Sequence, residues 1–195
     1  LKSLRLRTKS EEDMKNWRSF ADRVKSANDE VNIAVIGKYF DTGDFVLSDA
    51  YISVIEATKY SAYKLGVKPK LSWLNSKDLE SDEKKVLLLK NYDGVIVPGG
   101  FGESGIEGKL KAIKFVRENK IPYLGLCYGM QLAVIEYARN VLGLKDANTT
   151  EIDPNSKNPV IDIMSDQKKN MEDEKYGGTM RLGAYKAVLG KGTIA

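Results

Sequence analysis

The chain of 195 residues contains no histidine and only one cysteine, Cys127. One cysteine cannot form an internal disulfide, which favours a reducing, cytoplasmic setting. The chain also lacks an apolar run long enough to span a membrane, and its first residues lack the apolar core of a signal peptide. Its net charge of +4 comes without a long basic run. We therefore expect neither a membrane nor nucleic acid as a partner.

The length and composition of the chain fit one α/β domain with a sizeable core. From Val31 onward, short β-branched apolar runs alternate with amphipathic segments. Strands are expected at residues 31–37, 70–74, 94–100 and 121–126, and helices at 49–65, 82–90, 106–118 and 129–142. Regular alternation with short connections predicts a three-layer α/β/α arrangement around a mainly parallel central sheet.

Both ends of the chain depart from this alternation. Residues 10–24 combine an N-cap serine, an acidic first turn and apolar residues at helical spacing, which predicts an amphipathic helix. We expect residues 1–30 to be a clasp or a linker from another domain. After Leu144 the pattern predicts a loop (145–159), a possible strand (160–164), a charged, poorly ordered segment (165–178) and an edge hairpin (177–195).

Cys127 lies between a predicted strand and a predicted helix, in the pattern Gly125-x-Cys127-x-Gly129. This is the form of a nucleophile elbow at the carboxyl edge of a sheet, where the flanking glycines make room for a strained turn. The helix N-terminus would favour a thiolate, and the backbone N–H of Tyr128 would bind an oxyanion. The alternative is a small buried cysteine that serves only in packing.

A second glycine-rich turn, "VPGGFGESG", ends the third predicted strand. Its glycines allow the backbone to approach a ligand with N–H groups turned inward, although the spacing of a phosphate-binding loop is absent. If the third and fourth strands are neighbours, Gly100 of this turn lies near Cys127 and supplies a second oxyanion donor. A flexible turn of small residues is the alternative.

The run from Val97 to Glu151, with the later "GGTMRLG", closely resembles the glutamine amidotransferase domain of the CTP synthase family, a class I (triad-type) domain. The resemblance extends from Val31 to the end of the chain. It implies a flavodoxin-like fold for residues 31–195. Residues 1–30 then resemble the linker from that family's synthase domain.

The resemblance also implies a reaction. Cys127 would attack the side-chain amide carbon of L-glutamine, with the backbone N–H groups of Gly100 and Tyr128 stabilising the oxyanion and contacting the substrate. Ammonia would leave, and water would hydrolyse the resulting thioester to glutamate. The ammonia would pass to a synthase domain, where UTP is aminated to CTP at the expense of ATP.

The same resemblance assigns further residues of the site. Gly129, Met130 and Gln131 match the stretch that contacts glutamine, and Glu151 matches an acidic residue that receives the α-amino group. Arg181 belongs to a segment that resembles a lid linked to activation by GTP. We expect no metal or cofactor in this chain. ATP and Mg²⁺ would belong to the synthase domain, and the full-length protein is expected to be a tetramer.

The chain departs from the family pattern because family members continue to a catalytic histidine and glutamate, whereas this chain ends at Ala195. Hydrolysis of a thioester needs a general acid and base within hydrogen-bond reach. We therefore expect a C-terminally incomplete domain that is inactive alone, with exposed apolar surface and an unpaired sheet edge. Two alternatives stay open: a triad-deficient binding or regulatory module, and a peptidase or redox sensor of the wider fold.

Overall fold

The computed structural model describes residues 11–37, 51–100, 104–172, 186 and 188–193. Two compact units are distinguished, residues 1–161 and residues 162–195. The elements of the first unit are α1 (Glu11–Ser26), β1 (Glu30–Gly37), α2 (Ile52–Lys64), β2 (Lys68–Asn75), α3 (Ser76–Ser81), α4 (Glu83–Leu87), η3 (Leu88–Asn91), β3 (Gly94–Val97), α5 (Ile106–Glu118), β4 (Tyr123–Gly125), α6 (Tyr128–Asn140), β5 (Ala147–Thr149) and β6 (Asn158–Ile161). The described part of the second unit contains α7 (Ser165–Glu172).

Four parallel strands form the main sheet in the order β2–β1–β3–β4. In the register, Val35 of β1 stands opposite Trp73 of β2 and Ile96 of β3. Every residue of β3 is buried, as continuous apolar strands of a helix-covered parallel sheet require. Because the strands are parallel, the loops that follow β3 and β4 emerge at the same edge. The predicted mainly parallel sheet is confirmed.

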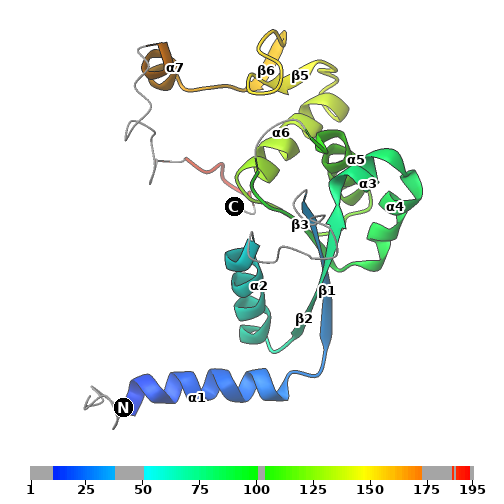
Figure 1. The fold of residues 1–195 in the computed structure, drawn as a ribbon. Coiled ribbons are helices and arrows are strands. Elements are labelled where there is room, and N and C mark those ends of the chain that lie inside the picture. Colours follow the sequence, from blue (N-terminus) through cyan, green and yellow to red (C-terminus); the bar gives the residue numbers. More distant parts are fainter. Residues whose placement is uncertain (1–10, 38–50, 101–103, 173–185, 187, 194–195) are drawn as a thin grey trace. The chain divides into compact units, whose positions relative to one another are not determined.

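Helices cover both faces of this sheet, because alternate residues of each strand point to opposite sides. Ala34 and Val95 belong to an apolar cluster that includes residues of α3, α4 and α5. Val35 and Ile96 face the other way, and Tyr51, next to α2, packs there. Figure 1 shows α2 on one side of the strands and α3 to α5 on the other. These are the three layers that the sequence predicts.

A second apolar cluster lies between α5 and α6. A charged pair also connects these two helices. Arg117 donates from Nε and Nη2 to the carboxylate of Glu136 at 2.9 and 2.8 Å. Glu136 is only 1% exposed, and Asn140 also donates to it. Hydrogen bonding to Glu136 raises the pKa of Arg117, so the guanidinium stays protonated. The pair fixes α6 against α5. It thereby also fixes the N-terminus of α6, which begins at Tyr128.

The expected helix near the N-terminus is confirmed as α1. Phe20 of α1 stacks on Tyr60 of α2 with ring centroids 4.6 Å apart, whereas Trp17 is 63% exposed. The helix therefore contacts the sheet-covering layer through one aromatic pair and leaves much of its apolar side in solvent. Its assignment as a linker stays a prediction.

Two predictions of secondary structure were wrong, and one helix was missed. Residues 147–149 form β5, paired in parallel with β6, where a loop was expected. Residues 165–172 form α7 rather than a poorly ordered segment, and the Lys168–Asp162 ion pair at 2.6 Å supports its first turns. The helix expected at 82–90 is present as α4 and η3. The missed helix is α3, which Asn75 caps by accepting from the N–H of Lys77. Most of the expected C-terminal hairpin lies outside the described residues.

Candidate active site

Cys127 lies at the turn between β4 and α6, as the sequence predicts. Its backbone has φ 53° and ψ −107°, and it is the N-cap residue of α6. A positive φ at a residue with a side chain is strained, and such strain clusters at functional turns. The thiol is exposed. The alternative of a buried packing cysteine is therefore wrong.

The glycines on either side of Cys127 make this turn possible. A Cβ atom at Gly129 would overlap the carbonyl oxygen of Val97, at the end of β3. A Cβ atom at Gly125 would lie 2.6 Å from the backbone carbon of Gly129. Real Cβ atoms do not approach backbone this closely, so both positions require glycine. The expectation that side chains two residues from Cys127 would crowd the turn is confirmed.

Hydrogen bonds hold the turn on both sides of the thiol. The N–H of Leu126 donates to the carbonyl of Val97 at 2.9 Å, and the N–H of Gln131 donates to the carbonyl of Cys127 at 3.1 Å. The hydroxyl of Tyr123 donates to the carbonyl of Gly129 at 2.7 Å. Burial raises the pKa of Tyr123, so the hydroxyl remains a neutral donor over the physiological pH range. The strained backbone is thus fixed by its surroundings.

The glycine turn after β3 lies beside the thiol, because β3 and β4 are neighbours with Val97 opposite Gly125. A Cβ atom at Gly99 would lie 3.5 Å from Cβ and 3.9 Å from Sγ of Cys127. Gly100 follows directly and is half-buried. Gly102 lies outside the described residues. The expected proximity of the two turns is confirmed, and the two backbone segments flank the same sulfur atom.

Glu151 is an exposed residue of the loop between β5 and β6. Hydrogen bonds and an apolar contact hold this loop in place. The N–H of Glu151 donates to Thr149 Oγ1 at 3.3 Å. Arg139 of α6 donates to the carbonyl of Ala147 at 2.7 Å, which ties β5 to the last turn of α6. Ile152 packs against the apolar cluster that contains Tyr128. The loop that carries Glu151 is therefore supported by the same helix that begins at the elbow.

The other predicted site residues are placed as follows. Tyr128 and Gly129 are buried in the first turn of α6. Met130 is 55% exposed, and Gln131 is half-buried in the same turn. Arg181 lies outside the described residues, so its role stays a prediction.

Sequence reasoning missed Lys109, a lysine of α5 that is only 1% exposed. Its Nζ lies 5.6 Å from the centroid of the Tyr128 ring. A signal for it existed, since Lys109 stands three residues after Ile106 and therefore shares the apolar face of α5.

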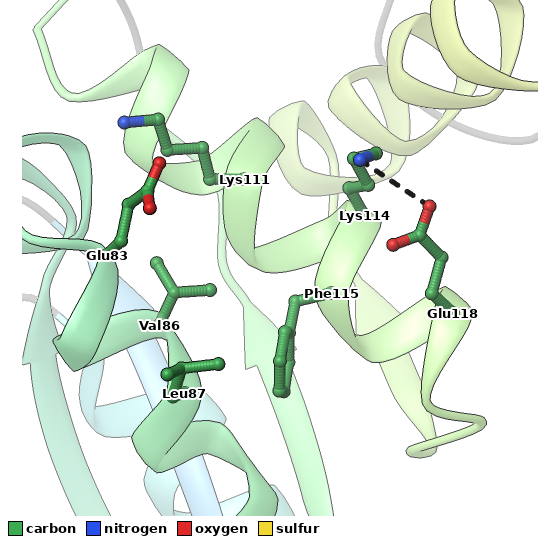
Figure 2. Close-up of a pocket in the computed structure, with 7 residues that line it drawn as sticks. All are labelled: Glu83, Val86, Leu87, Lys111, Lys114, Phe115 and Glu118. Atoms are coloured by element: carbon green, nitrogen blue, oxygen red, sulfur yellow. Dashed lines mark ion pairs between the residues drawn. The ribbon is translucent and has the colours of Figure 1, made fainter.

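A separate pocket of about 260 Å³ lies between α4 and α5 and is shown in Figure 2. Val86 and Phe115 provide apolar walls. Its lysines are already engaged: Lys114 is 3.6 Å from Glu118, and Lys111 donates to the carbonyl of Glu80 at 2.6 Å. Cys127 does not line this pocket. Because its lysines are engaged, the pocket is a weaker candidate for catalysis than the elbow.

Other kinds of site find no support in the residues that the structure describes. Among them, no group of three or more histidine, cysteine, aspartate or glutamate side chains is arranged to hold a metal ion. No helix in the described ranges combines the length and apolar character needed to cross a membrane.

Comparison with known proteins identifies the family of the chain. Residues 46–193 match the family described as glutamine amidotransferase class-I. The chain is 52% identical over 179 residues to the CTP synthase of Sulfolobus acidocaldarius, covering 92% of this chain and 32% of that protein. It is 50% identical over 190 residues to the CTP synthase of Methanocaldococcus jannaschii, covering 95% and 34%. The chain thus spans about a third of the length of these relatives.

A solved structure is also similar. It is described as the glutaminase domain of Trypanosoma brucei CTPS with bound acivicin. The two chains are 39% identical with a TM-score of 0.63, and the match covers 69% of this chain and 50% of the other. At this level of identity, the likeness extends to sequence as well as to fold.

Proposed function

Because the chain belongs to the class I glutamine amidotransferase family, we propose that it carries the nucleophile that releases ammonia from L-glutamine. The observation that carries this proposal is the exposed thiol of Cys127 on a strained turn, with Gly99 of the neighbouring turn so near that a Cβ atom there would lie 3.9 Å from the sulfur. A packing cysteine needs neither the strain nor the second turn. An acyl-transfer nucleophile needs both, since it must be exposed and must face oxyanion donors.

In the proposed reaction, Sγ of Cys127 attacks the side-chain amide carbon, and a C–S bond forms. The carbonyl electrons move onto oxygen, where the N–H groups of Tyr128 and Gly100 stabilise the negative charge. Collapse of this intermediate expels the amide nitrogen, which takes up a proton and leaves as ammonia. Water then attacks the thioester, restoring the thiol and giving glutamate.

Recognition of glutamine is proposed to involve the first turn of α6 and the loop after β5. Gly129, Met130 and Gln131 would contact the substrate beside the thiol. Glu151 would accept hydrogen bonds from the α-ammonium group, a role that suits an exposed carboxylate on a loop supported by α6. Gly100 and Tyr128 would contribute backbone contacts.

The chain contains no histidine, so a histidine base for Cys127 would have to come from outside these 195 residues. Without a base, a thiol is only a few per cent thiolate at neutral pH, and nothing activates the water that clears the thioester. We propose that the chain alone reacts slowly with electrophiles at Cys127 and does not turn over glutamine.

For the longer protein, the names of the relatives support the coarser proposal of a role in CTP synthesis. A synthase domain would use the ammonia to aminate UTP, with ATP and Mg²⁺ bound there. GTP would activate the glutaminase through the segment that contains Arg181. A tetramer is the proposed assembly.

Labelling with acivicin tests the glutamine site. We expect one adduct per chain, at Cys127, formed slowly and slowed further by L-glutamine but not by L-asparagine. Intact-mass spectrometry measures it, and Cys127→Ala is the control that should not be labelled. Labelling that L-glutamine leaves unchanged contradicts the glutamine site. Steady-state ammonia release that Cys127→Ala abolishes contradicts the proposed inactivity.

The second candidate function is a triad-deficient binding or regulatory module. The coding sequence separates the two. A histidine-bearing segment in frame after Ala195 supports the enzyme, and a stop codon there supports the module.

A further inference from the structure

The side chain of Lys109 is 1% exposed, although it carries an ammonium group. Lysine is almost never fully buried unless its charge is engaged, because removing an ammonium from water is costly. Lys109 belongs to the turn of α5 that precedes Leu110, a member of the apolar cluster between α5 and α6. A methionine would fill this space without the cost of desolvation. Packing alone therefore does not account for a lysine here.

The ammonium lies against the residue that follows the nucleophile. Nζ of Lys109 is 5.6 Å from the centroid of the Tyr128 ring, and that ring is only 2% exposed. This is the range of a cation–π contact, which is strongest where water is excluded. Tyr128 is the first residue of α6, so its side chain and its backbone N–H leave the same Cα directly after Cys127. Fixing the ring restricts the peptide that supplies the proposed oxyanion donor.

Lys109 is also joined to the glycine turn. Its backbone N–H donates to the carbonyl of Gly105 at 3.3 Å. Gly105 ends that turn in a left-handed conformation with φ 73° and caps α5. One residue is thus bonded through its backbone to the turn after β3 and in contact through its side chain with the turn after β4. These are the two turns that flank the sulfur of Cys127.

We propose that Lys109 is a positioning residue for the elbow, holding Tyr128 in place and adding a buried positive charge that favours negative charge at Cys127. Lys109 and the Tyr128 ring are both nearly fully buried, and electrostatic interactions are less screened in such surroundings than at the surface. A role of Lys109 in catalysis rests on the proposed glutaminase function. Its effect on the reactivity of the Cys127 thiol is independent of that function.

The test compares alkylation of Cys127 by iodoacetate, an anion, and by iodoacetamide, which is neutral and of similar size. Because Cys127 is the only cysteine, the rates for the 195-residue chain refer to one site. We expect Lys109→Met to lower the iodoacetate-to-iodoacetamide rate ratio about threefold or more, since a nearby cation attracts the anionic reagent. Lys109→Arg should recover at least half of the ratio. Lys114→Met removes one charge from an exposed position of the same helix and should leave the ratio unchanged.

A ratio unchanged by Lys109→Met in a folded chain, as judged by near-ultraviolet circular dichroism, overturns the proposal. A merely structural defect would alter both rates alike and leave the ratio in place. If Lys109→Met does not fold, the unmodified chain supplies the test: equal ratios in native buffer and in urea contradict the proposal, and a higher native ratio supports it. Failure of glutamine to protect Cys127 would refute the glutamine site without affecting this ratio.

Discussion

At two places in the molecule, a glycine lets two backbone segments approach closely. The two places differ in whether the nearby thiol or hydroxyl group is accessible to solvent. At the elbow, Gly129 lies directly against the carbonyl of Val97, and the neighbouring thiol of Cys127 points into solvent. At the junction of α3 and α5, Gly108 lies directly against the carbonyl of Ser76. The hydroxyl of Ser76 is fully buried and has no hydrogen-bond partner among the described residues.

The comparison separates packing from chemistry. Both contacts need glycine for the same steric reason, and both bring a nucleophilic atom, sulfur or oxygen, close to a helix N-terminus. Only the elbow leaves that atom accessible and flanks it with a second turn. Glycine therefore marks a close approach of backbone, and access to the reactive atom decides whether the place is a site.

The largest effect is expected from Gly129→Ala. The new methyl group must displace the end of β3 or the first turn of α6, which should cost about 3 kcal/mol of unfolding free energy. The rate of Cys127 alkylation in molecules that remain folded should also change, because the turn itself moves. Urea unfolding and iodoacetamide kinetics measure the two. Gly94→Ala is a matched control, since its methyl group approaches the flexible end of Ile33 at 3.2 Å and makes only ordinary contacts with Pro122, at 3.6 Å or more.

Gly108→Ala should cost about 2 to 3 kcal/mol by the same steric mechanism. In contrast to Gly129→Ala, it should change the alkylation rate of the folded fraction less, because the contact it disturbs is with α3 and the elbow is reached only through the adjacent Lys109. Equal losses of reactivity in the two variants would show that the distinction between the contacts is false.

A smaller effect is expected from Tyr123→Phe, which removes the hydrogen bond to the carbonyl of Gly129 and should cost about 1 kcal/mol at pH 7. The cost should shrink above pH 10. The pKa of Tyr123 is raised in the folded chain, so the unfolded chain releases its proton first and gains stability relative to the folded one. Urea unfolding at pH 7 and at pH 11 measures the difference, and a constant or growing gap would contradict the assigned burial.

Ser76→Ala should have the smallest effect and the opposite sign. Removing a buried hydroxyl without a partner should leave stability unchanged or raise it by up to about 1 kcal/mol. Asn75→Ala, which removes the cap of the adjacent helix, provides the contrast and should destabilise. A clear loss of stability in Ser76→Ala would mean that its hydroxyl is engaged.

The sheet and the elbow could be predicted because both depend on short sequence patterns. Continuous β-branched runs such as residues 94–97 indicate strands buried on both faces, and glycines two residues from Cys127 indicate a turn with no room for side chains. The helix over residues 106–118 was predicted with its observed bounds, because its apolar period is regular and Asn119 ends it.

What could not be predicted depends on contacts distant in sequence. Residues 147–149 read Ala-Asn-Thr and carry no alternating pattern, so they become a strand only by pairing with residues 158–161. Lys109 is one of 31 basic residues, and although its spacing from Ile106 places it on the apolar face of α5, nothing local shows that α6 will cover its ammonium group. The helix at 165–172 is weakly amphipathic and nearly all polar, which resembles a disordered segment by composition.

Any side chain at position 129 would overlap the backbone of β3, and this restricts which residues near the elbow can change during evolution. A descendant without the proposed reaction would still need glycine there to keep β3 and α6 together, whereas the packing does not require a sulfur atom two residues earlier, at position 127. In such a lineage the thiol would drift to serine or alanine long before its glycine neighbours changed. Among distant homologues, the element at position 127 therefore reports retained chemistry, and the glycines report only a retained scaffold.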